Sequence, residues 1–142
     1  MSPFLLDSNV LVALAWPAHV LHARAWRWFS TRGHCSWATC PFTQAAFVRI
    51  LSNPSFSSHS LTPLDAIRLL EANLAHPNHE FWANGIPLAT AIGKLGIRPT
   101  GHQQITDAYL LGLAMHRKGR LATMDQRIVA LGNVTELLEV IP

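Results

Sequence analysis

The fold of this chain is decided by the stretch Pro3-Phe4-Leu5-Leu6-Asp7-Ser8-Asn9-Val10-Leu11-Val12-Ala13-Leu14. Its first apolar run is too short for a helix and predicts a buried strand of a parallel sheet. The second run predicts a helix, whose free N–H groups Ser8 and Asn9 are expected to cap. Asp7 then lies where a strand meets a helix, at the edge where open α/β sheets bind ligands. A carboxylate in this place indicates metal binding or catalysis.

The rest of the chain alternates predicted strands and helices in the same way. Further strands are predicted over residues 35–39, 80–82, 120–124 and 137–141. Helices are predicted over residues 19–29, 41–51, 62–75, 87–96, 107–118 and 125–132. The face of the helix over residues 19–29 that is expected to pack inward carries Val20, Ala23, Trp26 and Phe29. This alternation predicts one domain, residues 1–142, with a three-layer α/β/α sandwich around a mostly parallel sheet. Because parallel strands need right-handed crossovers, we expect Asp7 and Asp125 on the same edge of the sheet.

The composition is that of a compact protein with a modest positive charge. Of the 142 residues, 49% are hydrophobic and 13% are charged, which excludes an intrinsically disordered chain. No apolar run approaches the ~18–20 residues that cross a bilayer, and the N-terminus has no basic leader segment. We therefore expect a cytoplasmic protein that does not enter the membrane. The net charge of +3 and the pI of about 9.4 favour a polyanionic partner such as nucleic acid.

The two cysteines, Cys35 and Cys40, are expected to be free thiols. As the two ends of one strand, their Cα atoms would lie roughly 16 Å apart at ~3.3 Å per residue. A disulfide tolerates a Cα separation of only about 7 Å. Free thiols are typical of a reducing compartment.

Acidic residues are scarce in this basic chain, and three of them occupy similar places. Asp7 and Asp125 each follow an apolar strand directly, and Asp107 begins a helix that Thr106 is expected to cap. Three carboxylates at one sheet edge repel one another and stay ionised only beside a cation. Oxygen ligands select Mg²⁺ or Mn²⁺, which activates a bound water and polarises a phosphoryl oxygen. We therefore predict a Mg²⁺ (or Mn²⁺) site at Asp7, Asp107 and Asp125 that acts on a phosphodiester. Helix capping alone would explain any one of the three.

Two neutral side chains are candidates to support these carboxylates. Asn9 is expected to orient Asp7 or to bind a water, unless it only caps the helix. Thr123 lies two residues before Asp125, so that both side chains point to the same face of the strand. Its hydroxyl is a candidate to hold Asp125 or a water, the alternative being β-propensity alone. Both residues are counted among the candidate catalytic residues.

Basic residues give weaker indications. Residues 117–120 lie at the start of the strand that leads to Asp125, roughly 15 Å from it at ~3.3 Å per residue, so we expect structural roles for them. Two arginines lie closer to the predicted carboxylate site. Arg127 follows Asp125, and Arg49 lies in the helix predicted over residues 41–51. Each is a candidate for a phosphate contact, or else for an ion pair or a solvated role.

Four segments carry a family resemblance: Leu6-Asp7-Ser8-Asn9-Val10-Leu11, Cys40-Pro41-Phe42-Thr43-Gln44-Ala45-Ala46-Phe47-Val48-Arg49-Ile50-Leu51, Thr106-Asp107-Ala108-Tyr109-Leu110-Leu111 and Leu121-Ala122-Thr123-Met124-Asp125. In this order and spacing they resemble the PIN domain, and within it the VapC-type toxins of bacterial toxin–antitoxin pairs. The resemblance implies a metal-dependent endoribonuclease that cuts cellular RNA (tRNA, rRNA or mRNA) to halt translation. It also implies a cognate antitoxin protein and a homodimer. The family's acidic residues match Asp7, Asp107 and Asp125.

Gln44 departs from the family pattern, which usually has an acidic residue, often Glu, at this point. An amide oxygen ligates weakly, carries no charge and cannot act as a general base. We keep Gln44 among the candidate catalytic residues and expect one well-bound metal ion rather than two. Two alternatives stay open. One is a catalytically weakened PIN binding module, and the other is a phosphatase or phospho-receiver in which Asp7 is a covalent nucleophile, although Asn9 stands where such enzymes usually have a second Asp.

Overall fold

The computed structural model describes residues 2–32, 34–132 and 134–142. Within these residues, five strands form one sheet in the order β3-β2-β1-β4-β5. They are β1 Phe4–Leu6, β2 Trp37–Thr39, β3 His79–Phe81, β4 Arg120–Thr123 and β5 Leu138–Val140. Each described pairing is parallel, and Leu5 of β1 pairs with Ala38 on one side and Leu121 on the other. The expected parallel sheet is confirmed, with β1 at its centre.

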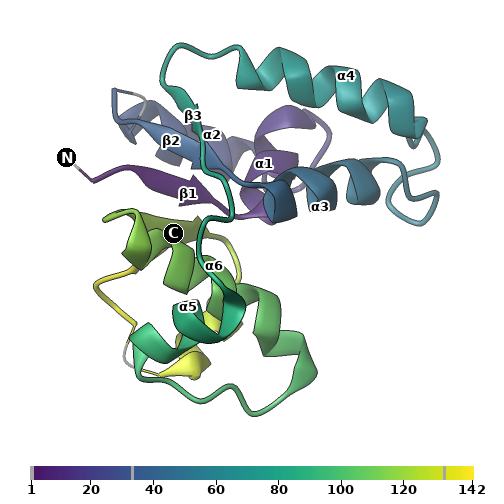
Figure 1. Ribbon diagram of the computed structural model, residues 1–142. Coiled ribbons are helices and arrows are strands. Elements are labelled where there is room, and N and C mark those ends of the chain that lie inside the picture. Colours follow the sequence, from purple (N-terminus) through teal and green to yellow (C-terminus); the bar gives the residue numbers. More distant parts are fainter. Residues whose placement is uncertain (1, 33, 133) are drawn as a thin grey trace.

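Helices cover both faces of this sheet (Figure 1). They are α1 Ser8–Ala15, α2 His22–Arg32, α3 Pro41–Leu51, α4 Pro63–Leu74, α5 Leu88–Leu95 and α6 Ile105–His116, with the 3-10 helices η1 His102–Gln104 and η2 Gln126–Leu131. Phe4 and Leu6 pack in one hydrophobic cluster with residues of α1 to α4. Leu5 packs in a second cluster with residues of α5 and α6. Alternating side chains of β1 thus face opposite layers, which confirms the α/β/α sandwich.

The predicted inward face of α2 is wrong. The sequence pattern suggested that Trp26 faces the core, but its side chain is 45% exposed, whereas Ala25 and Trp28 are buried. The reason is that side chains on the face of α2 that was expected to pack inward bond backbone carbonyl groups at the end of α1. His22 Nδ1 lies 2.7 Å from the Ala13 carbonyl oxygen, and Trp26 Nε1 donates to the Leu14 carbonyl oxygen at 3.2 Å. Helix ends leave such carbonyls without intrahelical partners.

Helix α6 is fixed by a close approach to α5. A Cβ added at Gly112 of α6 would lie only 2.5 Å from the carbonyl oxygen of Ala91 in α5. Glycine therefore allows the two helix backbones to touch, which positions the first turn of α6 beside the sheet. Elsewhere in the described chain, Cys35 and Cys40 are buried and free, as predicted. None of the described helices has the length and hydrophobicity that crossing a membrane requires.

Candidate active site

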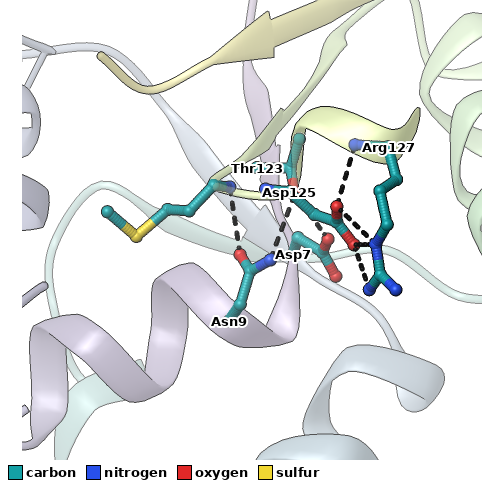
Figure 2. A network of polar contacts seen from close by, with 6 residues as sticks. Asp7, Asn9, Thr123, Asp125 and Arg127 are labelled. Carbon is teal, nitrogen blue, oxygen red and sulfur yellow. Dashed lines mark hydrogen bonds and ion pairs between the residues drawn. The ribbon is translucent and has the colours of Figure 1, made fainter. Parts of the chain in front are cut away.

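Asp7 lies directly after β1, at the carboxyl edge of the sheet (Figure 2). Its backbone N–H donates to the carbonyl oxygen of Ala122 in β4 at 2.9 Å. The side chain is buried, and its Oδ1 accepts a hydrogen bond from the Ser8 N–H at 2.8 Å. The expected caps of α1, Ser8 and Asn9, are therefore wrong. Asp7 keeps extended backbone angles right up to the helix start and caps it itself.

Thr123, the last residue of β4, holds Asp7 in place. Its hydroxyl donates to Asp7 Oδ2 at 2.8 Å and accepts from the backbone N–H of Asp125 at 3.1 Å. Thr123 thus bonds Asp125 as expected, but through the Asp125 backbone N–H, and its hydroxyl also bonds the Asp7 carboxylate. Because β4 pairs with β1 in parallel register, the end of β4 comes beside Asp7, while the chain turns away at Asp125. Both oxygens of Asp7 are therefore fixed by hydrogen bonds.

Asn9 connects α1 to the end of β4. Its Nδ2 donates to the Thr123 hydroxyl at 3.2 Å, and its Oδ1 accepts from the Met124 N–H at 3.2 Å. Figure 2 shows these contacts on the side of Thr123 away from Arg127. Among the described residues, Asn9 makes no hydrogen bond to Asp7. It therefore orients this carboxylate only indirectly, by fixing the threonine that bonds it.

Asp125 follows β4 and is clamped by Arg127 (Figure 2). Arg127 Nε donates to Asp125 Oδ1 at 3.0 Å and Nη2 donates to Oδ2 at 2.9 Å. The Arg127 backbone N–H also donates to Oδ1, at 2.9 Å, so that Asp125 caps η2. The side-chain hydrogen bonds from Arg127 hold the pKa of Asp125 below its ordinary value, against the opposing effect of burial. Of the roles considered for Arg127, the structure shows the ion pair.

Asp107 comes to this site from a helix and not from a strand end. Helix α6 already begins at Ile105, and Gln104 takes the cap position, so Thr106 lies inside the first turn and the expectation that it caps is wrong. Among the described residues, the Asp107 carboxylate has no hydrogen-bond partner. Burial, followed by the negative charges of Asp7 and Asp125, raises the pKa of Asp107 to about 6, while Arg127 acts in the opposite direction.

The three aspartates are thus electrostatic neighbours. Burial raises the pKa of Asp7, and the charge of Asp125 adds to this, against hydrogen bonds from Thr123 and Ser8 that lower it. A cavity of about 480 Å³ is lined by Gln103, Gln104, Asp107, Asp125, Arg127 and Leu131. In the described part of the chain, no three His, Cys, Asp or Glu side chains are already arranged to hold a metal ion. The donor chemistry nevertheless suits a hard divalent cation, because it consists of carboxylate oxygens whose repulsion such an ion relieves.

Gln44 lies in the first turn of α3 and is held by the end of β2. Its Nε2 donates to the Thr39 hydroxyl at 2.9 Å, and this hydroxyl lies 2.8 Å from Nε2 of His79. Burial is the main cause that lowers the pKa of His79 below its ordinary value. Among the described residues, Gln44 makes no hydrogen bond to the aspartates. Sequence reasoning missed Thr39 and His79, although Thr39 ends β2 as Thr123 ends β4, which is a signal that could have found it.

Two of the basic residues over 117–120, Arg117 and Arg120, make the structural contacts expected of them. Arg117 Nη2 donates to the carbonyl oxygen of Ala83 at 3.3 Å, and Arg120 Nη2 donates to that of Leu138 at 2.9 Å. Lys118 occupies a positive φ of 57° just beyond α6. These residues lie at the amino end of β4, at the opposite edge of the sheet from Asp125.

Comparison with known proteins gives consistent matches. Residues 4–134 match the family model of the PIN domain. The chain is 46% identical over 123 residues to Ribonuclease VapC39 of Mycobacterium tuberculosis, covering 85% of this chain and 87% of that protein. It is 42% identical over 127 residues to Ribonuclease VapC38 of the same species, covering 89% and 88%.

Solved structures share the fold at low sequence identity. The structure of Mycobacterium tuberculosis VapC20, described as a Sarcin-Ricin loop cleaving toxin, has a TM-score of 0.69 at 14% identity and covers 98% of this chain and 99% of that chain. The DNA-bound VapBC of Salmonella typhimurium has a TM-score of 0.65 at 16% identity, with 100% of both chains covered. At these identities the structures show the fold alone.

Proposed function

This chain belongs to the PIN domain family, with VapC ribonucleases as its relatives, and from this premise we propose that it is an endoribonuclease toxin of a type II toxin–antitoxin pair. The observation that carries the proposal is the electrostatic coupling of Asp7, Asp107 and Asp125 at one edge of the sheet. Burial and the charges of Asp7 and Asp125 raise the pKa of Asp107, and a shift with such causes in a partly buried site is typical of functional sites. The comparisons give no support to the alternative of an aspartate-nucleophile phosphatase.

The proposal includes a divalent cation, Mg²⁺ or Mn²⁺, held by Asp7, Asp107 and Asp125. When bound, such an ion supplies an acidified water and charge stabilisation for the hydrolysis of a phosphodiester. Oxygen donors favour these hard ions over zinc or copper. With Gln44 in place of an acidic residue, we propose one well-bound ion rather than two.

The chain's own contribution is to fix the carboxylates before substrate arrives. Thr123 and the Ser8 N–H bond the two oxygens of Asp7, and Asn9 in turn bonds Thr123. Side chains held by packing and hydrogen bonds need no reorganisation during the reaction, which is the main benefit of such support. Asn9 and Thr123 are therefore proposed as positioning residues, whereas Asp7, Asp107 and Asp125 would contact the reacting groups through the ion.

We also propose the context in which this enzyme works. The substrate is RNA, which suits a chain of net charge +3, and the inhibitor is a cognate antitoxin protein. We propose that residues 1–142 form a single domain, because one sheet contains strands from both ends of the chain. We further propose a homodimer and, from the free thiols Cys35 and Cys40, a cytoplasmic location.

The experiment is expression of the chain in bacterial cells followed by mapping of new RNA 5′ ends. We expect discrete new ends that are absent with the Asp107→Ala variant, provided that immunoblots show equal amounts of the two proteins. Cleavage of the same RNA by the purified protein should need Mg²⁺ or Mn²⁺ and stop with a chelator. A folded, expressed protein that binds RNA and produces no new ends would instead indicate a weakened binding module, the alternative that Gln44 motivates.

A further inference from the structure

Arg127 neutralises one of the carboxylates that the proposed metal site needs. Both oxygens of Asp125 receive hydrogen bonds from its guanidinium, at 3.0 Å from Nε and 2.9 Å from Nη2. The pair is asymmetric in exposure, because the Arg127 side chain is 87% exposed and that of Asp125 only 22%. The arginine therefore approaches the carboxylate from the solvent side, where it also lines the cavity beside Asp107.

The guanidinium is not needed for the local backbone. The N–H of Arg127 already donates to Asp125 Oδ1, and this bond alone caps η2. Any residue other than proline at position 127 can make it. The side chain is thus available for another purpose, and an exposed ion pair of this kind is weak enough to exchange partners.

A divalent ion and the guanidinium compete for the same carboxylate. Each is positive, each uses the oxygens of Asp125, and Arg127 is close enough to Asp107 to lower its pKa. An arginine released from a carboxylate has a natural second partner in a phosphodiester, whose two non-bridging oxygens match its fork of donors.

We propose that Arg127 has two positions: on Asp125 in the metal-free protein, and on the RNA phosphodiester once a divalent ion takes over Asp125. This inference rests on the proposed function, because it assumes the ion and the substrate. The Arg127 side chain would thus compete with the metal ion for Asp125 and, once displaced, contact the substrate phosphate. Metal binding therefore creates the phosphate contact, and the metal-free protein keeps its most exposed site carboxylate paired.

The test begins with calorimetric titration of the metal-free full chain with Mn²⁺ at low ionic strength. We expect R127Q to bind Mn²⁺ about fivefold tighter than the wild type, because a nearby competing charge is removed. R127K should show part of this gain in Mn²⁺ affinity, because lysine keeps the positive charge but cannot bond both oxygens of Asp125. The control R68Q removes an arginine of similar exposure that pairs with Asp65 in α4, and should change nothing. An R127Q or R127K affinity equal to that of the wild type would overturn the proposal.

A second measurement follows Arg127 directly. In ¹⁵N-labelled protein, the Nε–H signal of Arg127 should shift and exchange faster with water when Mg²⁺ is added. In the presence of Ca²⁺, a hard ion that also takes oxygen ligands, R127Q should bind a short single-stranded RNA more weakly than R68Q does. Metal binding that leaves the Arg127 signal unchanged would contradict this inference alone. A wild-type protein that binds no divalent ion would contradict the proposed function as well.

Discussion

At the scale of single residues, the three aspartates of the site differ in their hydrogen-bond partners and in the charges around them. Asp7 has both oxygens bonded by the chain, and Asp125 has both bonded by Arg127. Asp107 has no hydrogen-bond partner in the described chain, and the negative charges of Asp7 and Asp125 lie nearby. Burial and these charges make the ionised form of Asp107 unfavourable in the metal-free fold, and a bound cation would relieve this.

We expect Asp107→Asn to stabilise the metal-free protein while abolishing RNA cleavage. The pKa of Asp107 is about 6 in the folded protein, against an ordinary value of 3.8 for an aspartate side chain. The folded state thus binds more protons between these values, and the wild type loses stability as the pH rises from about 4 to about 7. Allowing for screening at this half-buried group, the variant should gain about 1 kcal/mol at pH 7.5 and almost nothing at pH 4.

Urea denaturation of both proteins in a chelator, at the two pH values, measures this gain. Comparing variant with wild type at each pH cancels the groups that do not interact with Asp107, including His79, whose lowered pKa acts with the opposite sign. A loss of stability at pH 7.5 would contradict this prediction, because it would mean that the ionised Asp107 carboxylate stabilises the fold.

Thr123 gives a second prediction at this scale. Thr123→Val removes the hydroxyl from a buried threonine and leaves Asp7 Oδ2 without its 2.8 Å hydrogen bond. We expect a loss of about 1–3 kcal/mol in unfolding free energy and weaker metal binding, because a buried charged acceptor is left unsatisfied. Thr123→Ser is the matched control, since it keeps the hydroxyl and should keep most of the metal affinity. Equal metal affinities for the two variants would contradict the positioning role.

At the scale of elements, Asp107 depends on how α6 is held. The touching backbones of α5 and α6 at Gly112 set the place of the first turn of α6. We expect Gly112→Ala to cost about 1–3 kcal/mol of stability, because the neighbour of the new methyl group is backbone and cannot move aside. Gly93→Ala in α5 is the control, since nothing lies within 4 Å of its added Cβ and a helical alanine should stabilise by up to about 1 kcal/mol. Thermal unfolding of both variants measures these changes. A Gly112→Ala variant as stable as the wild type would contradict the close approach of the two helices.

The elements also show what the sequence could and could not predict. The strands and most helix bounds could be predicted from apolar runs, proline and glycine, because these features determine structure within a short stretch of sequence. The inward face of α2 did not, because the carbonyls at the end of α1 bond Trp26 and His22. The start of α6 at Ile105 was missed because Gln104 makes no side-chain cap. Likewise, the partners of Gln44 lie on two other elements, which no local pattern specifies.

At the scale of the whole molecule, the strand order explains why the site lies where it does. From central β1 the sheet continues to β2 and β3 on one side and to β4 and β5 on the other. Ligands of open α/β sheets bind at the carboxyl ends of the strands where the order reverses, and Asp7 and Asp125 flank that point. Figure 1 shows the helical layers on the two faces of this sheet. The placement of these two aspartates was therefore predictable from the sequence. Asp107 was also expected at this site, but at a strand–helix boundary, whereas it lies inside the first turn of α6.

The most direct test of the central claim is a crystal of the wild-type protein grown with Mn²⁺ and measured at the manganese absorption edge. We expect one anomalous peak among Asp7, Asp107 and Asp125, in contact with their oxygens directly or through water, and with Arg127 displaced from Asp125. A manganese peak at other residues, or no peak under conditions in which the protein cleaves RNA, would contradict it.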